Sequence, residues 1–169
     1  MQRIVEGELE SIQPFFEAAA AIAQNAMCQR AKCGAIIVKD GIIIGRGYNG
    51  PALDNEINRM CRNVYDLSLK PKYDKTCCIH AEWRAILDAC KRNAGNIGGS
   101  VLYFMRVDDE GAFTDAGDPF CTTCSRLTLE TGVGYFALWN AGGADVYEAE
   151  EYNRLSYKFF TPILPGHPS

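Results

Sequence analysis

Apolar residues near the start of the chain recur every three or four positions. Between residues 9 and 27 they define one face of a helix: Leu9, Ile12, Phe15, Phe16, Ala19, Ile22, Ala23, Ala26 and Met27. This period predicts an amphipathic helix packed on a core. Pro14 falls in the first turn, where its missing N–H does not interrupt the helical hydrogen bonds.

Two short apolar runs follow and predict a β-hairpin. They cover residues 35–38 and 42–44 and are rich in isoleucine and valine. Asp40-Gly41 lies between them, and an Asp-Gly step between β-branched runs is typical of a hairpin turn. No period persists from Tyr48 to Thr76, so we predict a long loop there, with room for a helical turn.

The second half of the chain alternates between strand and helix patterns. The predicted elements are a helix from His80 to about 93–95, a strand at 101–107, an acidic glycine-rich loop at 108–118, a helix at 122–132, a strand at 133–139 and a helix at 147–160. Gly132 suits the left-handed conformation that often follows a helix. Alternation of this kind predicts an α/β sheet with helices on both faces.

The length and composition are those of one globular domain. The 169 residues contain no internal repeat or low-complexity segment, and a chain of this length buries one substantial core. Hydrophobic residues make up 47% and charged residues 22%, as is typical of soluble proteins. We therefore predict a single domain over residues 1–169, with the core at about 10–140 and a C-terminal helix and proline-rich tail at 141–169.

Neither a membrane nor a nucleic acid is expected as a partner. No apolar run approaches the roughly 18 residues of a membrane span, and the N-terminus lacks the apolar segment of a signal peptide, which favours the cytoplasm. The formal net charge is −4, whereas proteins that hold nucleic acids through phosphates carry a basic face. The charge favours a small-molecule substrate.

Three stretches contain residues suited to chemistry: His80-Ala81-Glu82, Cys121-Thr122-Thr123-Cys124 and Gly47-Tyr48-Asn49-Gly50. Catalytic zinc takes three protein ligands and leaves a fourth position for water. Two thiolates three residues apart at a helix start can face one ion, and the free N–H groups there favour negative sulfur. A Cys-x-x-Cys pair by itself also fits a redox pair or half of a structural zinc site.

His80 distinguishes between these interpretations. The chain has eight cysteines but only two histidines, and His167 lies in the proline-rich tail. A lone histidine at a helix start is usually a surface or capping residue, but here Glu82 follows two positions later. In the first turn of a helix both side chains can border one cavity. Glu82 could instead serve only to compensate the helix dipole. Cys33 and Cys90 could simply be buried apolar residues.

His-x-Glu followed by Pro and Cys-x-x-Cys is the signature of the zinc deaminases of nucleobases. The chain resembles the cytidine deaminase superfamily, and within it the deoxycytidylate (dCMP) deaminase branch, over roughly residues 10 to 140. The matching stretches are residues 33–38, 47–51, 80–86 and 121–124. The resemblance implies a three-layer α/β/α sheet, a homo-oligomer, and one catalytic zinc held by His80, Cys121 and Cys124 at the N-termini of two helices.

The resemblance also implies roles around the metal. Zinc lowers the pKa of water toward neutrality. Glu82 would take the proton of that water and return it, first to the ring nitrogen and then to the leaving ammonia. Asn49 and the backbone N–H of Ala81 would contact the substrate, although a Tyr-Asn-Gly sequence after a strand is also ordinary turn chemistry.

The chain departs from the family pattern in three places. Phe120 separates Pro119 from Cys121, the acidic segment 108–118 is longer than usual, and Arg84 stands where many relatives have asparagine. Acidic groups near the mouth of the site would disfavour a substrate phosphate unless arginines intervene. These departures weaken the choice of a nucleoside monophosphate as substrate but leave the metal ligands and Glu82 in place.

A second cysteine group resembles the extra, structural zinc site of some dCMP deaminases. Its members are Cys28, Cys61 and Cys77 or Cys78. A closed structural site takes four ligands, so both cysteines of the adjacent pair could take part. Buried thiols that hold a loop are the alternative.

Three functions follow as hypotheses. The leading one is zinc-dependent hydrolysis of dCMP to dUMP. The second is deamination of another nucleoside, of a free base such as guanine, or of a base within nucleic acid. The third is a non-catalytic, zinc-stabilised binding module, against which the intact Glu82 argues.

Overall fold

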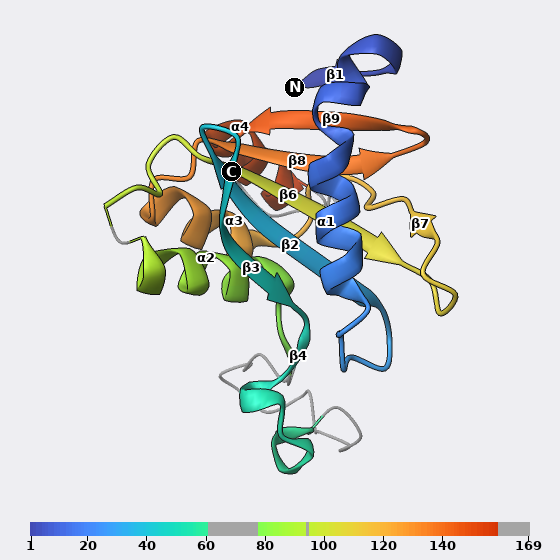
Figure 1. The fold of residues 1–169 in the computed structure, drawn as a ribbon. Helices are drawn as coiled ribbons and strands as arrows, with labels where there is room; N and C mark the ends of the chain where they lie inside the picture. The colour runs from blue at the N-terminus through green and yellow to red at the C-terminus, as the bar shows by residue number, and fades with distance from the viewer. Residues whose placement is uncertain (61–77, 94, 159–169) are drawn as a thin grey trace, which may run out of the picture.

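A mixed seven-stranded sheet forms the centre of the molecule (Figure 1). The computed structural model describes residues 1–60, 78–93 and 95–158. The strands are β1 (Gln2–Ile4), β2 (Lys32–Lys39), β3 (Ile42–Tyr48), β6 (Val101–Val107), β7 (Phe113–Thr114), β8 (Tyr135–Asn140) and β9 (Gly143–Glu148). Their order is β1-β9-β8-β6-β2-β3, with β7 paired to β6. Only β6 and β8 are parallel among the paired strands of these described residues.

Helices cover both faces of the sheet. Helix α1 (Gln13–Ala23) lies on one face, and α2 (Ala81–Arg92), α3 (Thr122–Glu130) and α4 (Ala149–Lys158) lie on the other (Figure 1). Each face has its own hydrophobic core: Phe16 of α1 belongs to one, and Ala85 of α2 and Tyr152 of α4 belong to the other. The expected three-layer α/β/α architecture is confirmed.

The sequence of strand β2 is apolar along most of its length because both faces of the strand are buried. Ile36 and Val38 pack in the core beneath α1, whereas Ala35 and Ile37 pack in the core beneath α2. A strand buried on both faces reads as a continuous hydrophobic run rather than as an alternation.

The predicted hairpin is present, with longer strands than expected. Asp40 and Gly41 have φ values of 50° and 76°, the positive pair that a type I′ turn requires. A second turn of the same kind joins β8 to β9 at Ala141 and Gly142, with φ values of 44° and 72°. Its sequence, Ala-Gly, is a weaker turn signal than Asp-Gly, so it did not reveal the hairpin.

Several predicted boundaries were wrong. The first helix begins with a 3-10 segment, Glu6–Ser11, and its α-helical part ends at Ala23 rather than at residue 27. The segment 108–118 contains the short strand β7, and β9 occupies residues taken for a connection and for the start of the last helix. Strand β1 was also missed. It pairs with β9, where Gln2 lies opposite Val146, a contact between positions too distant in sequence for local periodicity to detect.

Residues 48–60 contain the kind of helical turn for which the predicted loop had room, and also a short strand that was not predicted. Strand β4 (Gly50–Pro51) pairs with β5 (Cys78–Ile79), and two 3-10 turns, Ala52–Asp54 and Glu56–Asn58, follow β4. The rest of the predicted loop and the proline-rich tail lie outside the described residues. Within the described parts of the chain, no helix has the length and apolar character needed to cross a membrane.

The N-terminus of α2 lies directly on β3. A Cβ atom at Gly47 would come within 2.3 Å of the Ala81 carbonyl oxygen and 2.4 Å of the Ala85 nitrogen. Only glycine permits this approach of two backbones. The close contact fixes the first turn of α2 against the sheet, next to His80.

Candidate metal centre

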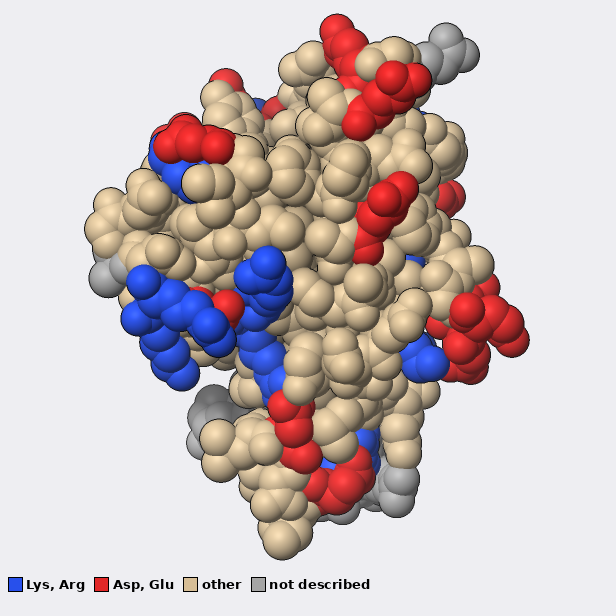
Figure 2. Space-filling view, viewed as in Figure 1, with Lys and Arg blue, Asp and Glu red and all other residues tan. Residues whose placement is uncertain are grey.

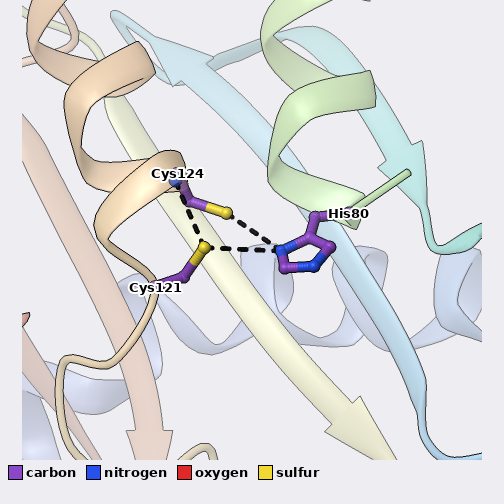
Figure 3. A group of neighbouring side chains, drawn as sticks. All are labelled: His80, Cys121 and Cys124. Carbon is purple, nitrogen blue, oxygen red and sulfur yellow. Dashed lines mark hydrogen bonds between the residues drawn. The ribbon is translucent and has the colours of Figure 1, made fainter. Parts of the chain in front are cut away.

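Three side chains that could bind a metal converge between two helices (Figure 3). The Nδ1 atom of His80 lies 3.2 Å from the Sγ atom of Cys124 and 3.5 Å from that of Cys121. The three donor atoms all lie within 4.8 Å of one another. Tetrahedral zinc, with bonds of about 2.0–2.3 Å to nitrogen and sulfur, places its ligand atoms at such separations. Among the described residues, this is the group of histidine, cysteine and acidic side chains that could hold a metal.

Two helix N-termini position these ligands. His80 is the N-cap of α2, and Cys121 is the N-cap of α3, with Cys124 in its first turn. The Cys124 N–H donates a hydrogen bond of 3.2 Å to the Cys121 sulfur. N-terminal N–H groups have no acceptor within the helix and carry a partial positive charge, so they stabilise a thiolate.

The two thiols respond differently to this environment. Hydrogen bonds from Cys124 and His80 lower the pKa of Cys121 to about 4, against the opposing effect of its burial. Burial and the negative charge of its neighbours raise the pKa of Cys124 well above the usual value. A divalent metal beside the two sulfurs would favour the thiolate form of both.

Glu82 faces the same space from the first turn of α2. Its side chain is buried, with 6% of its surface exposed. Burial raises the pKa of this carboxyl above its ordinary value, while nearby His80 acts in the opposite direction. A carboxylate with a raised pKa next to a metal site is suited to accept and return protons.

A pocket of about 430 Å³ opens above these residues. Its polar lining includes Asn49, His80 and Glu82, and Phe104 and Leu138 supply apolar walls. Tyr152 of α4 also lines it, stacked on Phe136 with ring centroids 3.9 Å apart. The volume suits a small molecule rather than a macromolecular segment.

Asn49 and Ala81, which the family resemblance implies as substrate contacts, both line this pocket. The Asn49 side chain is tied to the backbone that enters β2: its Oδ1 accepts from the Cys33 N–H and its Nδ2 donates to the Ala31 carbonyl, each at 2.9 Å. Asn49 therefore fixes one wall of the pocket. Ala81 is the first residue of α2, so its N–H has no acceptor within the helix.

Most of the acidic groups of segment 108–118 have local partners. Asp108 and Asp115 accept backbone N–H bonds from Ala112 and Ala141, and Asp109 forms an ion pair of 3.1 Å with Lys32. Among these acidic groups, only Asp118 lines the pocket within the described residues. The expected repulsion of a substrate phosphate therefore rests on one carboxylate rather than on five.

The other two departures from the family pattern, Arg84 and Phe120, lie in different parts of the structure. Arg84 forms an ion pair of 2.6 Å with Asp54 and donates to the Pro51 carbonyl at 2.7 Å, so it holds the turn after β4. Phe120 lines the pocket while remaining half exposed. The inserted residue thus adds an aromatic edge to the rim of the pocket.

Pocket residues that were not predicted from the sequence include Phe104, Arg106, Leu138 and Tyr152. Tyr152 lies in a helix outside the motifs. Phe104 and Arg106 lie in a strand that reads as core, although a single arginine in such a strand is a signal that could have been noticed.

The second cysteine group is only partly described. Cys28 and Cys78 are half buried, whereas Cys61 and Cys77 lie outside the described residues. The six cysteines of the described parts of the chain form no disulfide.

The surface charge is divided into patches (Figure 2). On the face shown, basic side chains gather over α2 and β3, and acidic ones gather near β7 and at the end of the molecule that carries β1. No basic surface spans that face, which agrees with the net charge of −4.

Comparison with known proteins points to one family. Residues 9–138 match the cytidine and deoxycytidylate deaminase zinc-binding region. A deoxycytidylate deaminase of Mycobacterium phage D29 is 32% identical over 127 residues, which cover 70% of this chain and 86% of the relative. That of Schizosaccharomyces pombe is 33% identical over 122 residues, or 70% of this chain and 34% of the relative. The chain thus spans about a third of the length of the yeast relatives it matches.

Solved structures share the fold. The cytidine deaminase of Burkholderia pseudomallei aligns with a TM-score of 0.56 and 21% identity, covering 83% of this chain and 94% of that one. The dCMP deaminase of cyanophage S-TIM5, in complex with dCMP and dUMP, aligns with a TM-score of 0.50 and 24% identity, covering 75% and 79%.

Proposed function

Because this chain belongs to the cytidine and deoxycytidylate deaminase family, we propose that it hydrolyses dCMP to dUMP and ammonia. One observation carries the proposal: the buried carboxyl of Glu82 shares a pocket with His80 and Cys121, two of the three convergent metal-binding side chains. A structural metal site has no use for a carboxylate with a raised pKa in an open pocket, whereas a hydrolytic site requires one.

The donor set suits zinc, the metal of this family. We assign His80, Cys121 and Cys124 as its ligands, since their Nδ1 and two Sγ atoms meet the spacing and softness that zinc prefers. When bound, zinc supplies a Lewis acid that brings the pKa of water toward neutrality and leaves one position open.

Glu82 moves the protons in the proposed reaction. Its carboxylate accepts a proton from the attacking water as the water oxygen bonds to C4 of the cytosine ring, and it delivers that proton to ring N3. It then carries the second proton of the water to the departing amino group, so the C4–N bond breaks and ammonia leaves. The ring keeps a proton on N3 and a carbonyl at C4, which is uracil.

The pocket walls hold the base for this transfer. Phe104 and Leu138 offer apolar surface to the faces of the ring, and the Ala81 N–H offers a donor to its edge. Asn49 lies at the wall formed with Cys33, where its amide keeps capacity for a sugar hydroxyl.

The choice of dCMP is supported by the phage relative, which is a deoxycytidylate deaminase matched over most of its length.

Deamination of another nucleoside, a free base or a base in nucleic acid is the second candidate function. A non-catalytic zinc module is the third. The family resemblance favours a homo-oligomer, and we propose a cytoplasmic location. We also propose a second, structural zinc at Cys28, Cys61 and Cys77 or Cys78.

A panel of substrates tests the activity. Ammonia release should be fastest with dCMP, slower with deoxycytidine, and absent with guanine and with single-stranded DNA. If guanine or DNA were deaminated fastest, that compound would replace dCMP as the proposed substrate. If no member of the panel were deaminated, the non-catalytic binding module would be favoured.

A further inference from the structure

The pocket contains a cation that deamination itself does not need. Arg106 of β6 lines the pocket together with His80 and Glu82. Cytosine is neutral at pH 7, and its deamination requires a proton carrier and a Lewis acid. The guanidinium of Arg106 is therefore unexplained by the chemistry at the base.

The strand places Arg106 on the pocket side of the sheet. Side chains alternate along a strand, and Arg106 shares its face with Phe104 and Leu102, which pack in the core beneath α2. Met105 between them packs beneath α1. Arg106 is half buried, so its charge lies at the wall of the pocket rather than in open solvent.

Arg106 has no ion pair or hydrogen bond from its side chain within the described parts of the chain. Neighbouring cations differ, since Lys32 pairs with Asp109 at 3.1 Å and Arg84 pairs with Asp54 at 2.6 Å. A guanidinium at the wall of a pocket, with no side-chain partner of its own, is available to bind an anion. Its position is best accounted for by an anion that enters with the ligand.

The β2–β6 register places Arg106 beside the wall that Asn49 fixes. Arg106 lies opposite Cys33, and the Cys33 N–H donates to Asn49. Burial raises the pKa of the Cys33 thiol to about 12, with Glu82 acting in the same direction and Arg106 against it. Cys33 is therefore close enough to interact electrostatically with both the Glu82 carboxyl and the Arg106 guanidinium. Of these two groups, Glu82 is the one that acts on the nucleobase.

We propose that Arg106 binds the 5′-phosphate of the substrate and thereby selects the nucleoside monophosphate over the nucleoside. The inference rests on the proposed deaminase function. The phosphate is the anionic group of dCMP, and a guanidinium can bind two of its oxygens at once. Of the acidic groups of segment 108–118, only Asp118 shares the described pocket lining with Arg106.

The test measures kcat/KM for dCMP and for deoxycytidine in the wild type and in Arg106→Gln, which keeps a polar side chain but removes its charge and shortens its reach. We expect kcat/KM for dCMP to fall roughly 10- to 100-fold, mainly through KM, as for the loss of one charged hydrogen bond. The value for deoxycytidine should change less than about 3-fold. Arg106→Lys should recover part of the dCMP value.

Arg46→Gln is the matched control, because Arg46 is an exposed arginine of β3 in the same sheet and does not line the pocket. It should leave both substrates unchanged. Binding of the products gives a readout independent of turnover: by calorimetry, the Kd of dUMP should rise by the same factor in Arg106→Gln, and the Kd of deoxyuridine should not.

The outcomes separate the two proposals. Equal losses for dCMP and deoxycytidine, or an unchanged preference for dCMP, would overturn the role of Arg106 while deaminase activity stands. A wild type that deaminates deoxycytidine as well as dCMP would overturn it too. A wild type that deaminates neither would overturn the proposed function itself.

Discussion

At the scale of single residues, the chemistry depends on where a side chain stands in a helix. Glu82 is a first-turn acid, a place where glutamate is common because it compensates the helix dipole. Its burial and its place in the pocket distinguish it from such an acid, since a residue that serves only the dipole remains in solvent. The proton-carrying role therefore predicts a loss of rate without a loss of structure.

Glu82→Gln should lower kcat for dCMP by about 10⁴-fold or more, because the amide keeps the shape and hydrogen-bonding reach but cannot carry protons. Zinc content and melting temperature should stay close to those of the wild type. Asp118→Asn, which removes a second carboxylate from the pocket lining, should change kcat less than about tenfold. Retention of more than about a tenth of the normal rate in Glu82→Gln would assign the proton transfer to another group.

At the scale of elements, the site depends on how closely α2 can approach the sheet. Gly45 and Gly47 of β3 leave room for the α2 backbone, and a Cβ at either would lie less than 2.5 Å from a carbonyl oxygen of that helix. Because His80 and Glu82 stand at the start of α2, this packing also determines where they meet the cysteines of α3.

Gly47→Ala should therefore destabilise the protein and impair the site together. Overpacking of this kind costs about 1–3 kcal/mol, so the melting temperature should fall by roughly 2–12 °C, and zinc should bind more weakly. Gly95→Ala is the control, since a Cβ there meets nothing within 4 Å, and it should leave both quantities unchanged. Equal stability of the two variants by thermal denaturation would contradict the packing argument.

At the scale of the whole molecule, the metal joins parts of the chain that are distant in sequence. His80 precedes α2 and the two cysteines begin α3, while Tyr152 of α4 closes the pocket beside them. Bound zinc would thus tie the two helices together at their N-termini. Since a metal that binds only the folded state stabilises it, its removal should lower stability.

Metal analysis should give at least one zinc per chain, and close to two if the second cysteine group binds metal. Cys124→Ala should remove one equivalent and lower the melting temperature, because a ligand and its metal are lost together. Cys61→Ala should remove the second equivalent and leave the first. Cys90→Ala, a half-buried cysteine packed against the core, should keep all the zinc. Metal-free wild-type protein, purified without chelators, would contradict the assignment.

Much of the fold and of the metal-binding group could be predicted from the chain alone, because both depend on local patterns. The helical period of residues 9–27, the Asp40-Gly41 turn and the spacing of His80, Cys121 and Cys124 each lie within a short stretch or a known motif. The α/β/α architecture and the family followed from them and are confirmed.

Only the tertiary structure decided which distant residues meet. The pairing of β1 with β9, the ion pairs that occupy Asp109 and Arg84, and the entry of Tyr152 into the pocket all join segments far apart in sequence. Arg106 is the clearest case: in the sequence it is one charge in an apolar strand, and its function depends on which face of the sheet it lies on. Local sequence specifies periodicity and turn conformation, whereas burial and charge pairing depend on the packing of all layers at once.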